Sequence, residues 1–356
     1  MLSLRQLLGL PSYLFGVGLM YWCFELATLC GFVRFWQLGP RRNDVSAAVR
    51  FLKWAFKFRV LRLGRNEVYR GRCMYLVNHR CWADFFIDMY VVGCRGVPLS
   101  RRAVGMAFPA FTSSLLSLRS ILLFNRAKTQ DKDKFNSWLD RELSKGPQNC
   151  LLVYPEGKRS QQNTSLPLKR GMLHYAYTRK LPVQAVVTSN KEEVLNESRM
   201  WAHFGRTLVT GSSEVLESSR FDDFESFMAA VQALWDAQWQ AVHSAPQHGL
   251  PELPEPVTAG GEYSGNQLAA QSASLIFWMA VMVGLGRIVL RVLAALAAHS
   301  LVGRCVVAAL VLHVVASLLA AALLPPPAKR SRRSSNGASV ASGSAVGASS
   351  ESEKEL

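Results

Sequence analysis

Short apolar runs alternate with amphipathic helical segments along the middle of the chain. Behind Asp222 and Asp223, apolar and aromatic residues recur at helical spacing, which predicts a long helix with one core-facing or membrane-facing stripe. Five other runs, rich in apolar and β-branched residues and followed by polar or turn-forming residues, predict buried strands at 73–77, 121–124, 150–154, 183–187 and 206–210. This alternation predicts an α/β domain with helices on both faces of its sheet.

Three apolar stretches of 24 residues each stand outside this pattern, at 10–33, 275–298 and 301–324. Each exceeds the roughly 20 residues that cross the apolar core of a bilayer. The first is interpreted as one span or as a pair of short hydrophobic helices broken near Gly16 and Gly18. The second carries Arg287 and Arg291 on one helical face, so it either crosses a membrane inside a bundle or lies in the interface.

Composition divides the chain further. The stretch after the long helix is rich in Pro and Gly, which is typical of a linker, and the end of the chain is rich in Ser, Gly and Ala. The predicted organisation is an N-terminal membrane segment at 1–36, an α/β domain at 37–245, a linker at 246–272, C-terminal hydrophobic helices at 273–324 and a disordered tail at 325–356.

The net charge of +16 is concentrated beside the apolar segments. Basic residues next to membrane segments favour a cytosolic position of both flanks, and they favour anionic lipid or a phosphate-bearing substrate over nucleic acid as the partner. The seven cysteines are odd in number and form no C-x-x-C pair. They are interpreted as reduced cysteines of an intracellular protein, with neither a disulfide framework nor a zinc site.

The first loop with candidate chemistry begins at Asn78, directly after the strand predicted at 73–77. It contains His79 and, five residues later, Asp84. A neutral imidazole can take a proton from a hydroxyl, and a carboxylate on its other nitrogen fixes the tautomer. Taken alone, the same pattern also fits a surface histidine followed by an acidic residue in the first turn of a helix.

The second loop follows the strand predicted at 150–154 and has the sequence Pro-Glu-Gly-Lys-Arg-Ser at 155–160. Its Pro and Gly predict a tight turn that presents Lys158 and Arg159 beside backbone amides, as binding of a phosphate monoester requires. Two further basic positions are candidates for the same ligand: Arg126 at the end of the strand predicted at 121–124, and Lys169. Each of these also fits an ordinary solvated charge.

Four ordered blocks resemble the glycerolipid acyltransferase family, whose best-known members are the 1-acylglycerol-3-phosphate acyltransferases. The resemblance covers about residues 71–190. The matching blocks are Asn78-His79 with Asp84, Ser120 to Arg126, Pro155 to Ser160, and Leu181 to Val186, with Lys169-Arg170-Gly171 as a further basic segment. Ser120 stands where the family usually has Gly, Lys158 where it has Thr, and Ala185 where it often has Pro. These departures leave the acyl acceptor open.

The resemblance implies a single mixed-sheet acyltransferase domain that uses acyl-CoA as co-substrate, with no metal and no other cofactor. The acceptor would be a lysophospholipid, 1-acyl-sn-glycerol-3-phosphate above all, within phospholipid biosynthesis at the endoplasmic reticulum. His79 would be the general base and Asp84 its orienting carboxylate. The substrate-binding residues would be Asn78, Arg126, Glu156, Gly157, Lys158, Arg159, Ser160 and Lys169.

Three alternatives remain open at the level of sequence. The acceptor could be glycerol-3-phosphate or a lysophospholipid with a larger headgroup. The chain could be a catalytically silent lipid-binding protein on the same fold, although the intact His79 and Asp84 argue against it. It could also be a lipid hydrolase that uses Cys81 or a serine beside His79, although no G-x-S-x-G segment is present.

Overall fold

The structure is a computed structural model that describes residues 3–33, 39–125, 131–146, 148–162, 164–258 and 261–324. The tail predicted at 325–356 and the candidate residue Arg126 lie outside the described residues.

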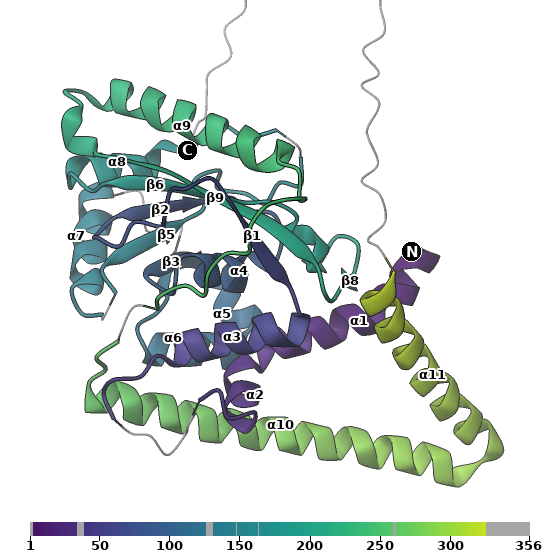
Figure 1. Cartoon of the computed structure of the whole chain (residues 1–356). Helices are drawn as coiled ribbons and strands as arrows, with labels where there is room; N and C mark the ends of the chain where they lie inside the picture. Colours follow the sequence, from purple (N-terminus) through teal and green to yellow (C-terminus); the bar gives the residue numbers. More distant parts are fainter. Residues whose placement is uncertain are drawn as a thin grey trace, which may run out of the picture. The chain divides into compact units, whose positions relative to one another are not determined.

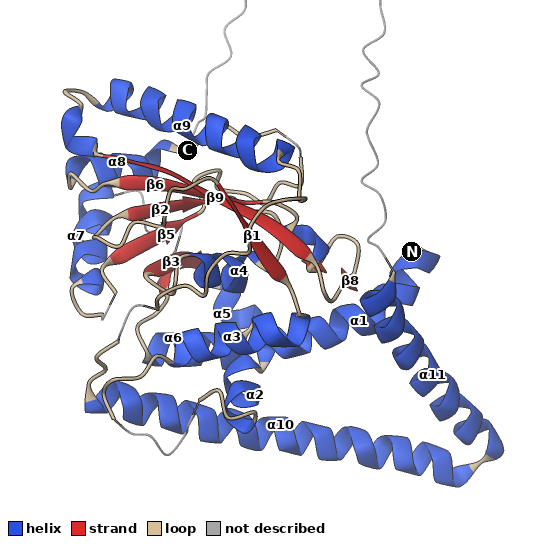
Figure 2. Cartoon of the chain, viewed as in Figure 1, coloured by secondary structure: helices blue, strands red, loops and turns tan. Residues whose placement is uncertain are grey.

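A seven-stranded mixed sheet forms the centre of the domain (Figure 2). Its spatial order is β1-β9-β6-β2-β5-β3-β4. Strands β6, β2, β5, β3 and β4 run parallel, whereas β9 and β1 run in the opposite direction at one edge. The strands are β1 Arg59–Leu63, β2 Met74–Val77, β3 Gly96–Arg101, β4 Leu122–Phe124, β5 Cys150–Val153, β6 Val183–Thr188 and β9 Thr207–Leu216.

The central strand β2 shows why its sequence is apolar at every position. Met74 and Leu76 point into the core on one face of the sheet, and Tyr75 and Val77 point into the core on the other. Side chains alternate across a strand, so a strand covered on both faces has no polar side. All five strands predicted from the sequence are present, which confirms the α/β fold class.

Two strands of the sheet, β1 and β3, were not predicted. The sequence of β1, Arg-Val-Leu-Arg-Leu, mixes charged with apolar residues because β1 is an edge strand. Strand β3 begins with Gly96 and contains Pro98, two residues that are depleted in strands. A further two-stranded sheet pairs β7 Leu195–Asn196 with β8 Trp201–Ala202.

Helices cover both faces of the sheet (Figure 1). On one face lie α7 Lys132–Leu143, α8 Arg170–Thr178 and α9 Phe224–Ser244. The other face carries α3 Asp44–Phe56, α4 Asp84–Val91 and α6 Pro109–Ser117. The short elements are α5 Ala103–Ala107, η2 Lys191–Glu193 and η3 Ser218–Arg220, the last two being 3₁₀ helices. The stripe of α9 is core, because Phe227, Val231, Trp235, Trp239 and Val242 are all buried.

The N-terminal apolar stretch forms two helices, α1 Leu4–Tyr21 and α2 Cys23–Leu29, with a bend of 77° between them. The predicted helix pair is therefore present, but the predicted break near Gly16 and Gly18 is wrong, because α1 continues through both residues. A Cβ atom on Gly16 would lie 2.9 Å from Ala202 Cβ and 3.1 Å from Leu195 Cδ1. Gly16 thus allows α1 to pack closely against the β7–β8 pair.

The C-terminal stretches form two long helices, α10 Gly265–His299 and α11 Leu301–Leu323. Both are long enough and apolar enough to cross a membrane, and the bent α1–α2 pair would be a third span if it counts as one. Only 6% of the most apolar window of α10 and 11% of that of α11 is buried against the rest of the protein. These faces therefore require an apolar environment, which identifies the chain as a membrane protein.

Candidate active site

The loops after β6, β2 and β5 meet at one end of the sheet, where the carboxyl ends of these strands lie. These three strands are parallel neighbours, so their carboxyl ends lie side by side. The loop after β2 carries the predicted pair His79 and Asp84, and the loop after β5 carries the Pro-Glu-Gly segment. The segment after β6 adds η2. The backbone N–H of Ser160 donates to the His79 carbonyl oxygen at 2.8 Å, which joins the first two loops directly.

His79 and Asp84 form the hydrogen-bonded pair that the sequence predicts. The distance from His79 Nδ1 to Asp84 Oδ2 is 2.6 Å. The histidine side chain is 29% exposed, whereas that of Asp84 is only 1% exposed. The imidazole stacks on the ring of Tyr154, with 4.2 Å between the ring centroids. Asp84 is therefore a buried partner that leaves the other nitrogen, Nε2, as the one available for an incoming group.

Asp84 is held in its ionised form by donors from its own loop and by a buried lysine. Its Oδ2 atom accepts hydrogen bonds from the backbone N–H groups of Arg80 at 2.5 Å and Cys81 at 3.1 Å. Lys191 Nζ lies 3.5 Å from Oδ1. Although burial alone would raise the pKa of Asp84, the Lys191 ammonium and the hydrogen bond with His79 lower it to about 2.

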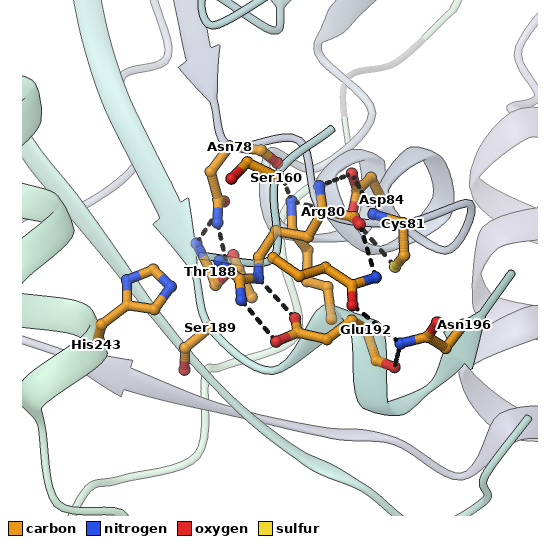
Figure 3. Close-up of polar contacts among 12 residues, drawn as sticks. Asn78, Arg80, Cys81, Asp84, Ser160, Thr188, Ser189, Glu192, Asn196 and His243 are labelled. Carbon is orange, nitrogen blue, oxygen red and sulfur yellow. Dashed lines mark hydrogen bonds and ion pairs between the residues drawn. The ribbon is translucent and has the colours of Figure 1, made fainter. Parts of the chain in front are cut away.

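A buried ion pair connects the same loop to η2 (Figure 3). The Arg80 guanidinium donates to both carboxylate oxygens of Glu192, at 2.6 Å each, and to the carbonyl oxygen of Gln162 at 3.0 Å. The exposed fractions of the Arg80 and Glu192 side chains are 0% and 3%. The two-point geometry fixes the path of the loop between His79 and Asp84 relative to the segment after β6.

Asn78 has a structural position at the same edge. Its side-chain amide donates to the Thr188 carbonyl oxygen at 2.9 Å, and its Oδ1 accepts from the Thr188 N–H at 3.0 Å. These two bonds extend the pairing of β2 with β6 by one residue, as Figure 3 shows. Asn78 is fully buried, so it sets the position of His79 from inside the fold.

The Pro-Glu-Gly loop presents one buried acid and exposed cations. Glu156 is 2% exposed, its Oε1 accepts from the Leu166 N–H at 3.0 Å, and burial raises its pKa. Gly157 has φ of +70°, which favours glycine, and a Cβ there would lie 3.2 Å from Lys169 Cγ. The side chains of Lys158 and Lys169 are exposed beside this turn.

Arg159 forms an ion pair with an acidic residue. Its guanidinium lies 2.7 Å from Glu197 Oε1, and Glu197 Oε2 accepts from the Trp82 N–H at 3.3 Å. Glu197 therefore connects the Pro-Glu-Gly loop to the loop of His79. The Arg159 side chain is 41% exposed. The strand before Arg126, β4, lies at the sheet edge and is separated from β5 by β3.

Sequence reasoning missed the buried charges that surround the predicted pair. Arg80, Lys191 and Glu192 carry full charges with almost no exposure. The loop after the strand predicted at 183–187 was a candidate location for functional residues, since it follows a buried strand. Its Lys-Glu-Glu sequence, however, also fits a solvated turn. For Arg80, only its position beside His79 was a signal.

Cys81 does not have the geometry of a nucleophile. It is 1% exposed, and its thiol donates to Asp84 Oδ1 at 3.4 Å. Burial raises the pKa of the thiol well above its usual range. Among the described residues, no Ser, Thr or Cys side chain is hydrogen-bonded to the His79 ring, and no group of three metal-ligating side chains is present.

Comparison with known proteins matches the part of the chain that contains these loops to a known protein family. The family model described as Acyltransferase matches residues 60–189, which contain most of β1, all of β2 to β6 and all the predicted site residues. The 1-acyl-sn-glycerol-3-phosphate acyltransferase of Saccharomyces cerevisiae is 27% identical over 139 residues, covering 38% of this chain and 44% of that protein. The human alpha enzyme of the same name is 28% identical over 116 residues, covering 33% and 40%.

Two further matches cover more of the chain. The human beta enzyme of that name is 23% identical over 202 residues, covering 55% of this chain and 70% of that protein. The solved structure of the 1-acyl-sn-glycerophosphate acyltransferase PlsC from Thermotoga maritima matches with a TM-score of 0.44 and 16% identity, covering 64% of this chain and 97% of that one. For the yeast and human alpha proteins, the matched region spans less than half of their length.

The buried Arg80–Glu192 pair generates a stability prediction. Arg80→Met leaves the Glu192 carboxylate buried without its cation, so we expect a loss of about 3–5 kcal/mol and a fall in Tm of roughly 6 °C or more. Arg80→Met/Glu192→Met should recover most of this loss, because uncharged side chains then fill the site. Thermal unfolding in detergent measures both variants, with Arg179→Met, from the half-exposed pair with Asp140, as the control. Equal Tm values for Arg80→Met and the wild type would contradict the prediction.

Proposed function

We propose that this chain transfers a fatty acyl group from acyl-CoA to the free hydroxyl of a lysophospholipid, because residues 60–189 match the family model described as Acyltransferase. The acceptor we infer is 1-acyl-sn-glycerol-3-phosphate, and the product is phosphatidic acid. The observation that carries the proposal is the 2.6 Å hydrogen bond between His79 and the buried Asp84 at the carboxyl end of β2. The similar proteins from yeast and human, which are 1-acyl-sn-glycerol-3-phosphate acyltransferases, support the choice of acceptor.

The proposed reaction is a direct attack of the acceptor hydroxyl on the thioester. His79 Nε2 takes the hydroxyl proton while the hydroxyl oxygen bonds to the carbonyl carbon. The carbon–sulfur bond then breaks, and the same imidazole gives its proton to the sulfur, which leaves as the thiol of CoA. Asp84, ionised throughout, stabilises the imidazolium that exists between these two steps. The proposed reaction requires no enzyme nucleophile and no metal. The burial and hydrogen bond of the Cys81 thiol agree with direct attack by the acceptor hydroxyl.

Binding of the acceptor phosphate is assigned to the Pro-Glu-Gly loop. Lys158, Arg159 and Lys169 bring exposed cations to one turn, beside the loop of His79. The Arg159–Glu197 pair is partly exposed, and such pairs contribute about 0–1 kcal/mol. A charge-assisted hydrogen bond to phosphate contributes about 1.5–3 kcal/mol, so an arriving phosphate can displace Glu197. Arg126 is proposed as a second cation for the same group.

The membrane segments give this reaction a location. Lysophospholipid and product both reside in a bilayer, and α10 and α11 hold the domain at its surface. We propose the endoplasmic reticulum, with the domain on the cytosolic side, since basic residues flank both apolar ends of the chain.

Removal of the base should abolish transfer. We expect His79→Ala to lower the rate by roughly 10²–10⁴-fold in membranes supplied with labelled acyl-CoA and a panel of lysophospholipids and glycerol-3-phosphate. The control is His174→Ala, since His174 is also half-buried and packs on a ring, that of Phe224 on α9. Activity of His79→Ala within a few-fold of wild type would refute the assignment, and preference for another acceptor in the panel would correct the substrate.

Removal of the phosphate ligand should change affinity for the acceptor. We expect Arg159→Ala to raise the KM for 1-acyl-sn-glycerol-3-phosphate by roughly 10- to 150-fold and to change the KM for acyl-CoA much less. Glu197→Gln removes the competing carboxylate and should lower the acceptor KM. Arg179→Ala is the matched control, because Arg179 also forms an ion pair but lies at the end of α8. If both KM values stay unchanged in Arg159→Ala, Arg159 is not a phosphate ligand.

The orientation is testable with sealed microsomes. We expect added protease to remove an epitope tag placed after Leu356 and to cut the exposed stretch at 246–249, while a lumenal marker protein stays intact. Protection of both the tag and the stretch until detergent is added would show that the domain faces the lumen.

A further inference from the structure

Lys191 is a fully buried lysine beside the proposed catalytic pair. It begins η2, three residues after the last residue of β6, and its side chain is 0% exposed. Nζ lies 2.9 Å from each carboxylate oxygen of Asp88 and 3.5 Å from Asp84 Oδ1, and it also donates to the Asn78 carbonyl oxygen. Removing an ammonium from water is costly by several kcal/mol, so this arrangement persists only because acidic and carbonyl oxygens surround the group.

The two oxygens of Asp84 have different partners. Oδ2 accepts from His79 and from two backbone amides, whereas Oδ1 faces the thiol of Cys81 and the ammonium of Lys191. Among the described residues, Lys191 supplies the one Lys or Arg side-chain nitrogen within 4 Å of this carboxylate. The lysine therefore balances the charge of Asp84 from the side opposite to the imidazole.

Lys191 also contacts the backbone immediately before His79. The carbonyl oxygen that it binds belongs to Asn78, the residue before the histidine. The side chain of Asn78 is at the same time paired with Thr188, three residues before Lys191. One short segment after β6 thus fixes the backbone before His79 and the carboxylate that orients its ring.

We propose that Lys191 is a positioning residue of this site: its ammonium keeps the Asp84 carboxylate ionised and its bond to Asn78 fixes His79, so that Nδ1 carries the proton and Nε2 receives the acceptor hydroxyl. This inference rests on the proposed function. Lys191 touches neither substrate, and it acts through Asp84 and Asn78.

A competing role for Lys191 is neutralisation of Asp88 alone. Asp88 lies four residues after Asp84, one turn along α4, so two carboxylates share one ammonium. Burial and the charge of Asp84 together raise the pKa of Asp88 to about 7, against the lowering effect of Lys191. Asp88 is therefore the carboxylate that can take up a proton if the lysine is lost. A test must remove Asp88 together with Lys191 to separate the two roles.

Several titratable groups act on Asp84 from the elements packed around it. They are His79, Arg80 and Cys81 in its loop, Asp88 on α4, Tyr154 after β5, and Lys191 and Glu197 after β6. A cation favours the unprotonated state of a carboxylate–imidazole pair. Loss of Lys191 should therefore let the His79–Asp84 pair take up its inactivating proton at a higher pH.

The experiment uses the full chain with Lys191→Met/Asp88→Asn, which replaces a buried ion pair by uncharged groups of similar size. We expect kcat to fall roughly 10- to 100-fold, the range found when a group that orients a metal-ligating histidine is lost, with the acceptor KM within about threefold of wild type. The acid limb of the kcat profile should move upward by about one pH unit or more. Lys191→Met alone should show the same upward shift of the acid limb of the kcat profile, because Asp88 can then be protonated.

A second measurement needs no turnover. Diethyl pyrocarbonate modifies unprotonated imidazole, and the partly exposed His79 can be followed by mass spectrometry as a function of pH. The midpoint pH of His79 modification should move upward in both variants. It should stay unchanged in the control Lys145→Met/Glu142→Gln, which removes a partly exposed ion pair. A wild type that transfers no acyl group would refute the proposed function, while this midpoint would still test Lys191. Wild-type kcat and an unchanged midpoint in the double variant would show that Lys191 only neutralises Asp88.

Discussion

The carboxylate of Asp84 is the group around which the candidate site is built. It is buried at the start of α4, where free backbone N–H groups of a helix favour a negative charge. Two amides of its own loop, the imidazole of His79 and the ammonium of Lys191 compensate its charge. A buried carboxylate without such partners would be protonated and could not orient the ring. The loop, the helix and the segment after β6 are therefore held in one arrangement by the requirement to satisfy a single charge.

The sheet determines which loops can share that charge. Strands β6, β2 and β5 are parallel neighbours, so three segments distant in the sequence end at the same edge. Pairing of Asn78 with Thr188 and of Arg80 with Glu192 connects two of them, and the Ser160–His79 backbone bond connects the third. Strand β9 runs antiparallel to β6, so it ends at the other end of the sheet and leads into α9. The aromatic stripe of α9 covers the face of the sheet that also carries α7 and α8.

The apolar helices belong to the same folded unit as the site but contribute none of its residues. α1 packs against the β7–β8 pair and against α11, where the Ser12 N–H donates to the Ser317 hydroxyl at 3.1 Å. The outer faces of α10 and α11 remain uncovered by protein. In a bilayer these faces contact lipid tails, while the basic residues beside them favour anionic headgroups. The site and the membrane segments thus belong to one folded unit that includes residues from both ends of the described chain.

The sequence by itself determined the α/β class, five of the seven strands of the sheet, the apolar helices and the His79–Asp84 pair, because each depends on local periodicity or on short spacing within one loop. It did not determine β1 or β3, whose charged, Gly and Pro residues are compatible with a strand only through their neighbours in the sheet. It misplaced the N-terminal break, because Gly16 serves a close contact with Ala202 that is remote in sequence. The oppositely charged residues Lys191 and Glu192, which pair with Asp84 and Arg80, come from η2, more than 100 residues away. Only the tertiary structure shows them, since the same Lys-Glu-Glu sequence is solvated or buried depending on the chain that folds over it.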